Sequence, residues 1–150
     1  MEQRKPADLA RAFYTALAAG DRDQLDALLH PEFTGRTTEG MPFGIGGDHN
    51  GPAAMRRNAW GAIARHFEAR AEPDRFLDLA DGRLLVTGRY RGRGKQDGGT
   101  LDVAFAHLIA VADGRIKALE HSPTPRAGTK PPALCERCCS TSRTALRRCA

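Results

Sequence analysis

The sequence predicts an α+β fold in which a cone-shaped, curved antiparallel sheet carries three N-terminal helices on its concave face. Residues 6–69 hold three segments whose apolar residues repeat at helical spacing, and residues 75–121 hold strand-like segments separated by turn signals. A chain of 150 residues that is 41% hydrophobic is long enough to build one core. We therefore expect a single domain with one concave pocket.

Three helices are expected in the first half of the chain. The first spans residues 6–19 and ends at Gly20, which suits the left-handed position after a helix. The second spans residues 22–29, with Asp21 placed to cap its free N–H groups. The third spans residues 52–69, where large apolar side chains recur on one face.

The remainder of the body is predicted to form strands. Asp-Gly pairs at residues 81–82 and 113–114 are strong hairpin signals. Residues 39–51 hold five glycines and one proline, so we expect an irregular loop there. The expected strands span residues 32–38, 75–80, 83–95, 100–112 and 115–121.

A change in composition divides the chain into a body, residues 1–125, and a tail, residues 126–150. The whole chain has a net charge of +5, and the tail holds six basic residues against one acidic residue, so the excess lies in the tail. The tail also holds all four cysteines: Cys135, Cys138, Cys139 and Cys149. The spacing of Cys135 and Cys138 allows a zinc site, while free thiols or a shifted reading frame are the alternative interpretations. We expect a disordered tail that belongs to no core.

The composition also argues against several function classes. The charges of the body balance, so a nucleic-acid partner is not expected. No run of about 18 apolar residues exists, so no membrane span is expected. The N-terminal residues lack an apolar signal segment, and we expect a cytoplasmic location. The glycines of residues 44–47 lack the spacing and the strand–helix context of a nucleotide-binding loop.

Two segments carry a family resemblance. The run ARAFYTALAAGDRDQLDALLHPEF, residues 10–33, resembles the opening of the nuclear transport factor 2-like superfamily, in its SnoaL-like polyketide cyclase and ketosteroid isomerase-like branch. The closing run FAHLIAVADGRIKALEH, residues 105–121, resembles that superfamily's last hairpin, and His49-Asn50-Gly51-Pro52 resembles the entry to its third helix. The resemblance implies the cone-shaped fold. It leaves the chemistry open, because this fold hosts cyclases, isomerases, hydrolases and binding proteins.

The residues that ketosteroid isomerases use are not present at the matching positions. Phe13 stands where the resemblance implies a tyrosine, Thr37 where it implies a carboxylate base, and Ala106 where it implies a carboxylic acid. SnoaL-like cyclases use a histidine and an aspartate on the late strands. Here the last strand lacks the family's aromatic residue and aspartate, which leaves His107, Asp102, Glu120 and His121 as substitutes.

The candidate catalytic residues are Asp102, Glu120 and His121. Alternation along residues 100–112 puts Asp102 on one face with small alanines, where a pocket has room, and His107 on the opposite face with bulky residues. We therefore expect Asp102 to exchange protons and His107 to support an interface, the alternative for Asp102 being a solvated strand end. Glu120 and His121 are neighbours, so only one of them faces inward.

The candidate ligand-binding residues come from helices, strands and the glycine-rich loop. Trp60 and Tyr90 are expected in the pocket wall, and His49 in a lid formed by the loop. The full set is Trp60, Tyr90, Tyr14, His49 and Phe43. Arg89, Arg91 and Arg93 are either an anion site or a solvated strand face. No cofactor and no metal site in the body is expected.

Two functions remain open. The first is a SnoaL-like pocket protein that acts on a hydrophobic small molecule by cofactor-independent acid–base chemistry, of the cyclase, isomerase or epoxide hydrolase type. The second is a non-catalytic binding or interaction module that has lost the acid and the base. A histidine or carboxylate that points into the cone would favour the first. We also expect a homodimer, because helices cover only one face of an apolar sheet.

Overall fold

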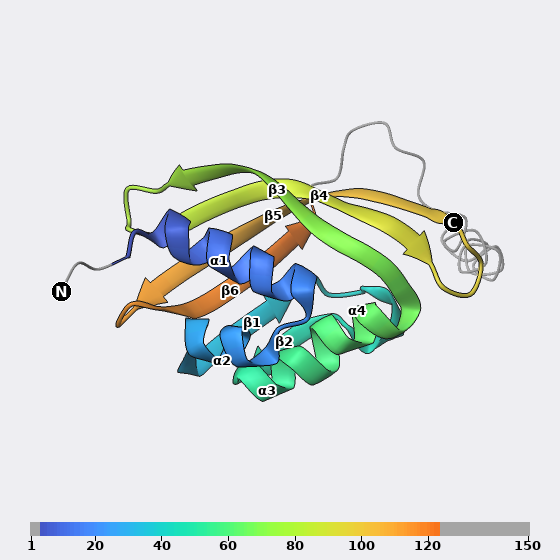
Figure 1. Ribbon diagram of the computed structural model, residues 1–150, viewed down its shortest axis with the longest axis horizontal. Coiled ribbons are helices and arrows are strands. Elements are labelled where there is room, and N and C mark those ends of the chain that lie inside the picture. Colours follow the sequence, from blue (N-terminus) through green and yellow to red (C-terminus); the bar gives the residue numbers. More distant parts are fainter. Residues whose placement is uncertain (1–3, 124–150) are drawn as a thin grey trace, which may run out of the picture.

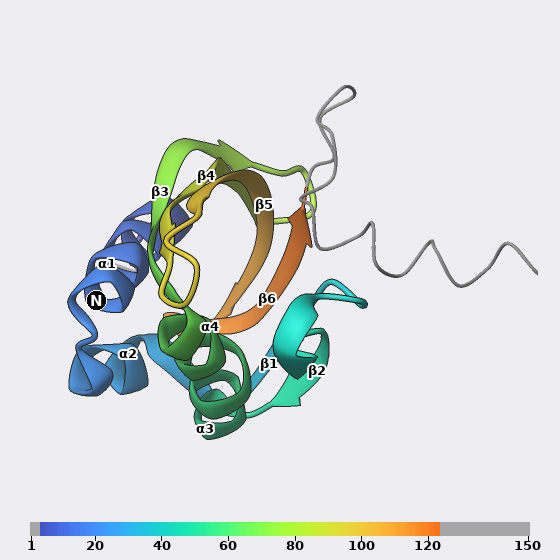
Figure 2. The ribbon, with the colours of Figure 1, turned by 90° about the vertical axis from the view of Figure 1, so that its right-hand side faces the viewer.

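The computed structural model describes residues 4–123, and these form one α+β unit in which helices lie on the concave side of a curved sheet (Figure 1). Figure 2 shows the strands bending around an interior that the helices close from one side. The predicted fold class is confirmed. The tail lies outside the described residues, and so do its four cysteines.

The first two helices confirm the local signals in the sequence. Helix α1 (Pro6–Ala19) ends at Gly20, whose φ of 66° is left-handed and whose N–H bonds back to the last turn. Helix α2 (Arg22–Leu28) begins at Asp21, whose carboxylate accepts a hydrogen bond from the backbone N–H of Gln24. These two caps form the turn between α1 and α2, and Phe13 of α1 is fully buried in the core.

The third predicted helix is shorter than residues 52–69 and is not uniform. It consists of α3 (Pro52–Met55), a π-helical turn (Arg56–Trp60) and α4 (Gly61–His66). A side chain at Gly61 would come within 2.7 Å of the Arg56 carbonyl oxygen, so this wide turn requires the glycine. A wide turn changes the directions in which the side chains after it point, compared with a regular helix.

The six strands form one sheet in the order β2-β1-β6-β5-β4-β3. Their bounds are β1 (Leu29–Thr37), β2 (Gly47–Asn50), β3 (Phe67–Asp78), β4 (Leu84–Gly94), β5 (Thr100–Ala112) and β6 (Arg115–Pro123). All neighbouring pairs are antiparallel except β1 and β6, which run parallel. Both Asp-Gly pairs form the predicted turns, and Asp113 and Gly114 both have positive φ.

Two predicted boundaries are wrong. Strand β3 begins at Phe67, inside the segment predicted to be helical. The predicted helix was too long because Phe67 continues the apolar spacing of the helix before it. The glycine-rich stretch, predicted to be irregular, holds a short 3₁₀ turn (Pro42–Gly44) and all of β2. Strand β2 contains almost no apolar residues, and only its pairing with β1 makes it a strand.

The core fills the space between the helices and the concave face of the sheet. Its largest fully buried side chains are Phe13, Phe33, Phe105, Leu9, Leu29, Ile45, Met55, Leu84, Ile109, Ile116, Leu119 and Val86. Three polar side chains are buried with them, from Thr37, His49 and His107. Buried polar groups need partners, and those partners define the site. Within residues 4–123, no helix is long and apolar enough to cross a membrane.

Candidate functional site

A small cavity lies inside the cone, between the third helical segment and the sheet. Its volume of about 20 Å³ holds one water-sized group. Its lining is apolar except for Thr37, Tyr90, His107 and His121. The full lining is Thr37, Met41, Met55, Ala59, Trp60, Ile63, Tyr90, His107, Leu119 and His121.

His107 is the most deeply buried polar side chain of the site, with 3% of its surface exposed. Its Nδ1 lies 2.6 Å from the hydroxyl of Tyr14, on α1, and its Nε2 lies 3.0 Å from the hydroxyl of Tyr90, on β4. The Tyr14 ring is stacked on the imidazole at an angle of 4°. Both ring nitrogens are therefore occupied, and the ring is held from a helix and from a strand.

Burial sets the protonation of this group of three residues. Burial, and then the nearby charge of His121, lower the pKa of His107 well below its usual 6.5, so the imidazole is neutral. Burial raises the pKa of Tyr90. Burial, helped by the charge of Tyr90, also raises the pKa of Tyr14. Both phenols therefore keep their protons at neutral pH.

His121 lies beside His107 near the end of β6, with 5.1 Å between the two ring centres. Its Nδ1 is buried and has no hydrogen-bond partner among the residues that the structure describes. Burial lowers the pKa of His121, so the imidazole is neutral and can accept a proton. His121 also lines an outer pocket of about 450 Å³ beside β1 and β2, and it thus separates this pocket from the inner cavity.

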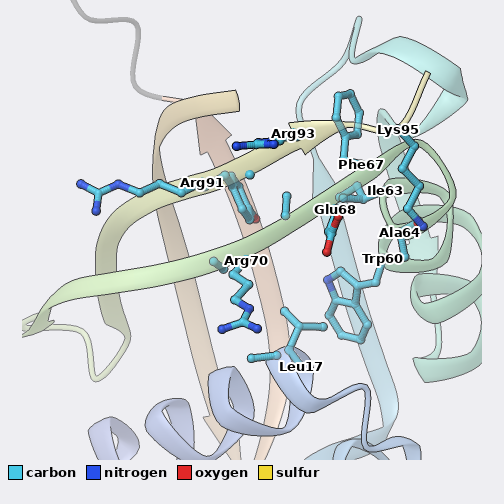
Figure 3. A pocket seen from close by; sticks show the side chains of 15 residues that line it. Leu17, Trp60, Ile63, Ala64, Phe67, Glu68, Arg70, Arg91, Arg93 and Lys95 are labelled. Carbon is cyan, nitrogen blue, oxygen red and sulfur yellow. The ribbon is translucent and has the colours of Figure 1, made fainter. Parts of the chain in front are cut away.

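A wider cleft of about 690 Å³ adjoins the inner cavity (Figure 3). It runs between the end of α1, helix α4 and the strands β3 and β4, and it shares Trp60, Ile63 and Tyr90 with the inner cavity. In Figure 3 Leu17 and Trp60 lie below strand β3, on the helix side of the cleft. A volume of this size is in the range of small-molecule sites.

Comparisons with known proteins show the family and the fold of this chain. The family described as the SnoaL-like domain matches residues 10–119. The chain belongs to this family. No curated protein matches the chain.

Solved structures place this SnoaL-like chain in the nuclear transport factor 2-like fold. An NTF2-like protein of unknown function from Burkholderia pseudomallei is similar, with a TM-score of 0.72 and 25% identity over 83% of this chain and 92% of that chain. A candidate polyketide cyclase from Sinorhizobium meliloti has a TM-score of 0.59 and 26% identity over 77% and 94%. TerC, crystallised with polyporic acid, has a TM-score of 0.71 and 22% identity over 80% and 92%, a likeness that shows the fold alone.

Four of the expected site residues meet at the inner cavity or beside it in this SnoaL-like chain. Trp60, Tyr90 and His121 line the cavity, and Tyr14 contacts it through His107. They come from α1, the π-helical turn, β4 and β6. The sequence could propose them one at a time, but only the packing of the helices on the sheet brings them together.

Two other expected ligand-binding residues do not line the cavity. His49 is buried behind Thr37, and its Nε2 contacts the Thr37 hydroxyl at 3.1 Å and the Ile45 carbonyl oxygen at 3.0 Å. It therefore anchors the loop before β2. Phe43 is 51% exposed and stacks on His66, with 3.7 Å between ring centres. It has a positive φ of 62°, which is rare for a residue with a side chain.

The face predicted for Asp102 is wrong. Alternation correctly separates Asp102 from His107, but the bulky face with Phe105 and Ile109 is the one that packs inside. The small alanines lie on the convex face, because the helices need large side chains to fill the interior. The Asp102 side chain is 49% exposed, and its carboxylate lies 2.5 Å from Nε of Arg89. Nothing brings this carboxylate to the cavity.

Glu120 and the arginines of β4 also lie away from the cavity. Glu120 is exposed, so His121 is the inward-facing member of that neighbouring pair. Arg91 contacts Glu72 at 3.1 Å and Asp102 at 3.7 Å, and together with Arg93 it also lines the wide cleft. Figure 3 shows the Arg91 side chain extending away from Trp60.

Sequence reasoning assigned His107 to an interface and missed its place in the site. A signal was present: His107 is the only polar residue in a run from Val103 to Val111. A buried histidine requires partners, and Tyr14 and Tyr90 are the only two tyrosines of the chain.

Within residues 4–123, no group of three or more metal-binding side chains gathers at one place.

Proposed function

We propose that this SnoaL-like protein acts on a hydrophobic small molecule by cofactor-independent acid–base chemistry, with His121 as the base. The observation that carries the proposal is the buried Nδ1 of His121, which has no hydrogen-bond partner among the described residues and lies in a ring that lines an apolar cavity. A buried polar atom without a partner is rare in a folded protein and is typical of a place where a ligand or water binds.

The proposed step is a proton transfer to the neutral imidazole. A substrate C–H bond next to a carbonyl group breaks, and the proton forms an N–H bond on His121. The electron pair of the C–H bond moves toward the carbonyl oxygen and gives an enolate. Return of the proton from His121 to another position isomerises the substrate. Alternatively, the enolate carbon attacks a second carbonyl of the same molecule and closes a ring, and the alkoxide oxygen that forms takes the proton back from His121. The lowered pKa of His121 keeps the imidazole unprotonated and ready at neutral pH.

The wide cleft supports a substrate larger than the inner cavity. Leu17, Trp60 and Ile63 form an apolar part of the cleft that suits the body of a hydrophobic molecule, and its volume of about 690 Å³ suits a drug-sized one. The lining also has a charged part, which comes from Glu68, Arg70, Arg91, Arg93 and Lys95. Tyr90 lines both the cleft and the inner cavity, so a substrate in the cleft would place its reactive end against Tyr90. TerC, which has the same fold, was crystallised with the small molecule polyporic acid, and this supports a small-molecule ligand here.

A general probe of base catalysis tests the proposal before the natural substrate is identified. An activated benzisoxazole opens its ring once a base removes its C–H proton, and the product absorbs visible light. The protein should accelerate this reaction above buffer, with a rate that rises with pH through the lowered pKa of His121. His121→Gln should remove the acceleration.

The neighbouring residue supplies the matched control. Glu120→Gln changes an exposed side chain on the same strand and should leave the rate unchanged. An equal rate in the wild type and in His121→Gln would overturn the assignment of the base.

The second candidate function is a binding module without turnover. It is favoured by one observation: no carboxylate lines the inner cavity in the described part of the chain, although cyclases of this family are expected to use an aspartate. Under this alternative, apolar molecules bind in the cleft, and the benzisoxazole reaction is no faster with the protein than in buffer.

We also propose that the protein is a homodimer that pairs through the convex face of the sheet.

A further inference from the structure

The hydrogen bonds of His107 have a direction, and the surroundings of Tyr14 decide it. A neutral imidazole carries one N–H donor and one acceptor nitrogen, so one tyrosine must donate to the ring and the other must accept from it. If Tyr14 donates to Nδ1, then Nε2–H donates to Tyr90. If Tyr90 donates to Nε2, then Nδ1–H donates to the oxygen of Tyr14.

The second arrangement leaves the hydroxyl hydrogen of Tyr14 without an acceptor. Tyr14 is 4% exposed, and three phenylalanine rings surround it: Phe13, Phe76 and Phe105. Its hydroxyl has no hydrogen-bond partner besides His107 in the described residues. A buried donor without a partner is disfavoured, so Tyr14 must donate to Nδ1.

The first arrangement leaves the hydroxyl hydrogen of Tyr90 available. Tyr90 lines the inner cavity, where there is room for one water-sized group. The same cavity is lined by His121, whose ring centre lies 5.7 Å from that of Tyr90. An oxygen atom in this space can accept from the Tyr90 hydroxyl while the group next to it faces Nδ1 of His121.

We propose that Tyr14 holds His107 in the Nε2–H form, so that Tyr90 donates its hydroxyl hydrogen to an oxygen atom of the substrate opposite His121. This inference rests on the proposed function for the role of His121. It adds the substrate class: molecules with a carbonyl or hydroxyl oxygen at the reactive end. Tyr90 is then the residue that stabilises negative charge on that oxygen, and Tyr14 and His107 are positioning residues.

Nitrogen NMR of protein labelled with ¹⁵N-histidine reads the arrangement directly. An acceptor nitrogen resonates far downfield of a protonated one, and the two-bond and three-bond couplings identify Nδ1 and Nε2. At neutral pH we expect Nδ1 of His107 to be the acceptor nitrogen. Tyr90→Phe should leave that pattern unchanged, because Tyr14 sets it. Tyr14→Phe should give a mixture of the two forms.

The opposite pattern in the wild type, with Nε2 as the acceptor, would overturn the inference even if neither variant folds. His121→Gln should leave the signals of His107 in the same form. The two proposals can therefore fail separately, because a result against His121 as the base does not change the pattern expected for His107.

The donor role of Tyr90 is tested by binding of two small aromatic probes. 2-Naphthol and naphthalene have the same ring system, but only 2-naphthol carries an oxygen. The wild type should prefer 2-naphthol by about tenfold, the usual effect of one net hydrogen bond. Tyr90→Phe should remove the preference without weakening naphthalene. No preference in the wild type would contradict the oxygen site.

Discussion

The Tyr14 hydroxyl lies 2.6 Å from Nδ1 of His107, which ties helix α1 to strand β5 across 93 positions of the chain. Both groups are buried, so neither can exchange this partner for water unless the core opens. The contact fixes how α1 lies on the concave face. It also orients the imidazole whose other nitrogen meets Tyr90 in the cavity.

Removing the Tyr14 hydroxyl should destabilise the protein through the nitrogen that it leaves behind. In Tyr14→Phe the buried Nδ1 of His107 loses its partner, and we expect a loss of about 1–3 kcal/mol in the free energy of unfolding. Urea denaturation measures this loss. Thr15→Ala, on the exposed side of the same helix, should change the stability by less than about 0.5 kcal/mol. Equal effects of the two variants would contradict the role of the contact.

Stability should fall as the solution becomes acidic, starting near pH 6.5. Burial lowers the pKa of both His107 and His121 in the folded chain, so the unfolded chain takes up their protons first. The free energy of unfolding therefore has its full value above the pKa that these histidines have in the unfolded chain. It decreases as the pH falls below that pKa. The slope reaches up to about 1.4 kcal/mol per pH unit for each histidine.

Urea denaturation of the wild type and of His121→Gln, from about pH 7.5 to about pH 5.5, tests this dependence. The variant should show a shallower slope, because one of the two neutral histidines is gone. Identical slopes would mean that His121 takes up its proton equally in the folded and unfolded chains.

Asp102→Asn should leave any proton-transfer activity intact. The carboxylate is on the convex face with Arg89, and His107 lies on the opposite face of the same strand. Loss of this half-exposed ion pair should cost less than about 1 kcal/mol. The benzisoxazole rate and the melting temperature measure the two effects. A large loss of rate in this variant, with the fold intact, would return Asp102 to the list of catalytic candidates.

The convex face should join two copies of the chain. On this face Leu108 lies opposite Leu85 in the register of β5 and β4, beside the small side chains of Ala104 and Ala106. Light scattering should report about twice the mass of 16.3 kDa. Leu108→Arg should give the monomer, whereas Thr15→Arg, at an exposed position of helix α1 on the other side of the sheet, should stay dimeric. A monomeric wild type would rule the interface out.

Removing the basic tail should have little effect on the body. Residues 126–150 show no regular spacing of apolar residues. A chain that ends at Thr124 should therefore melt within a few degrees of the full chain. Calorimetry of the two chains measures the difference. A large decrease in melting temperature would show that the tail packs on the body.

Local signals in the sequence were enough for the helix ends and hairpins. Gly20 and Asp21 end one helix and begin the next through bonds within a few residues, and the two Asp-Gly turns depend on the φ angles of their own residues. The long strand of residues 100–112 was also predicted correctly, because most of its residues are apolar. The helix ends and the turns are stabilised mainly by neighbours in the chain.

The partners of each strand were decided by contacts that no local pattern records. Strand β2 exists through its pairing with β1, and β1 joins β6 in parallel although the two are far apart in sequence. The start of β3 at Phe67 depends on pairing with Gly94, at the far end of β4. The apolar spacing there fits a helix and a strand alike.

The sequence by itself determined which residues of β5 share a face, because side chains alternate along any strand. It put His107 with Phe105 and Ile109, and Asp102 with the alanines, and the structure has the same grouping. Only the tertiary structure decided which face is inside. Both faces are apolar enough to be buried, and the choice depends on filling the space under α1 with large side chains. That choice brings His107 to Tyr14 and leaves Asp102 beside Arg89, outside the cavity.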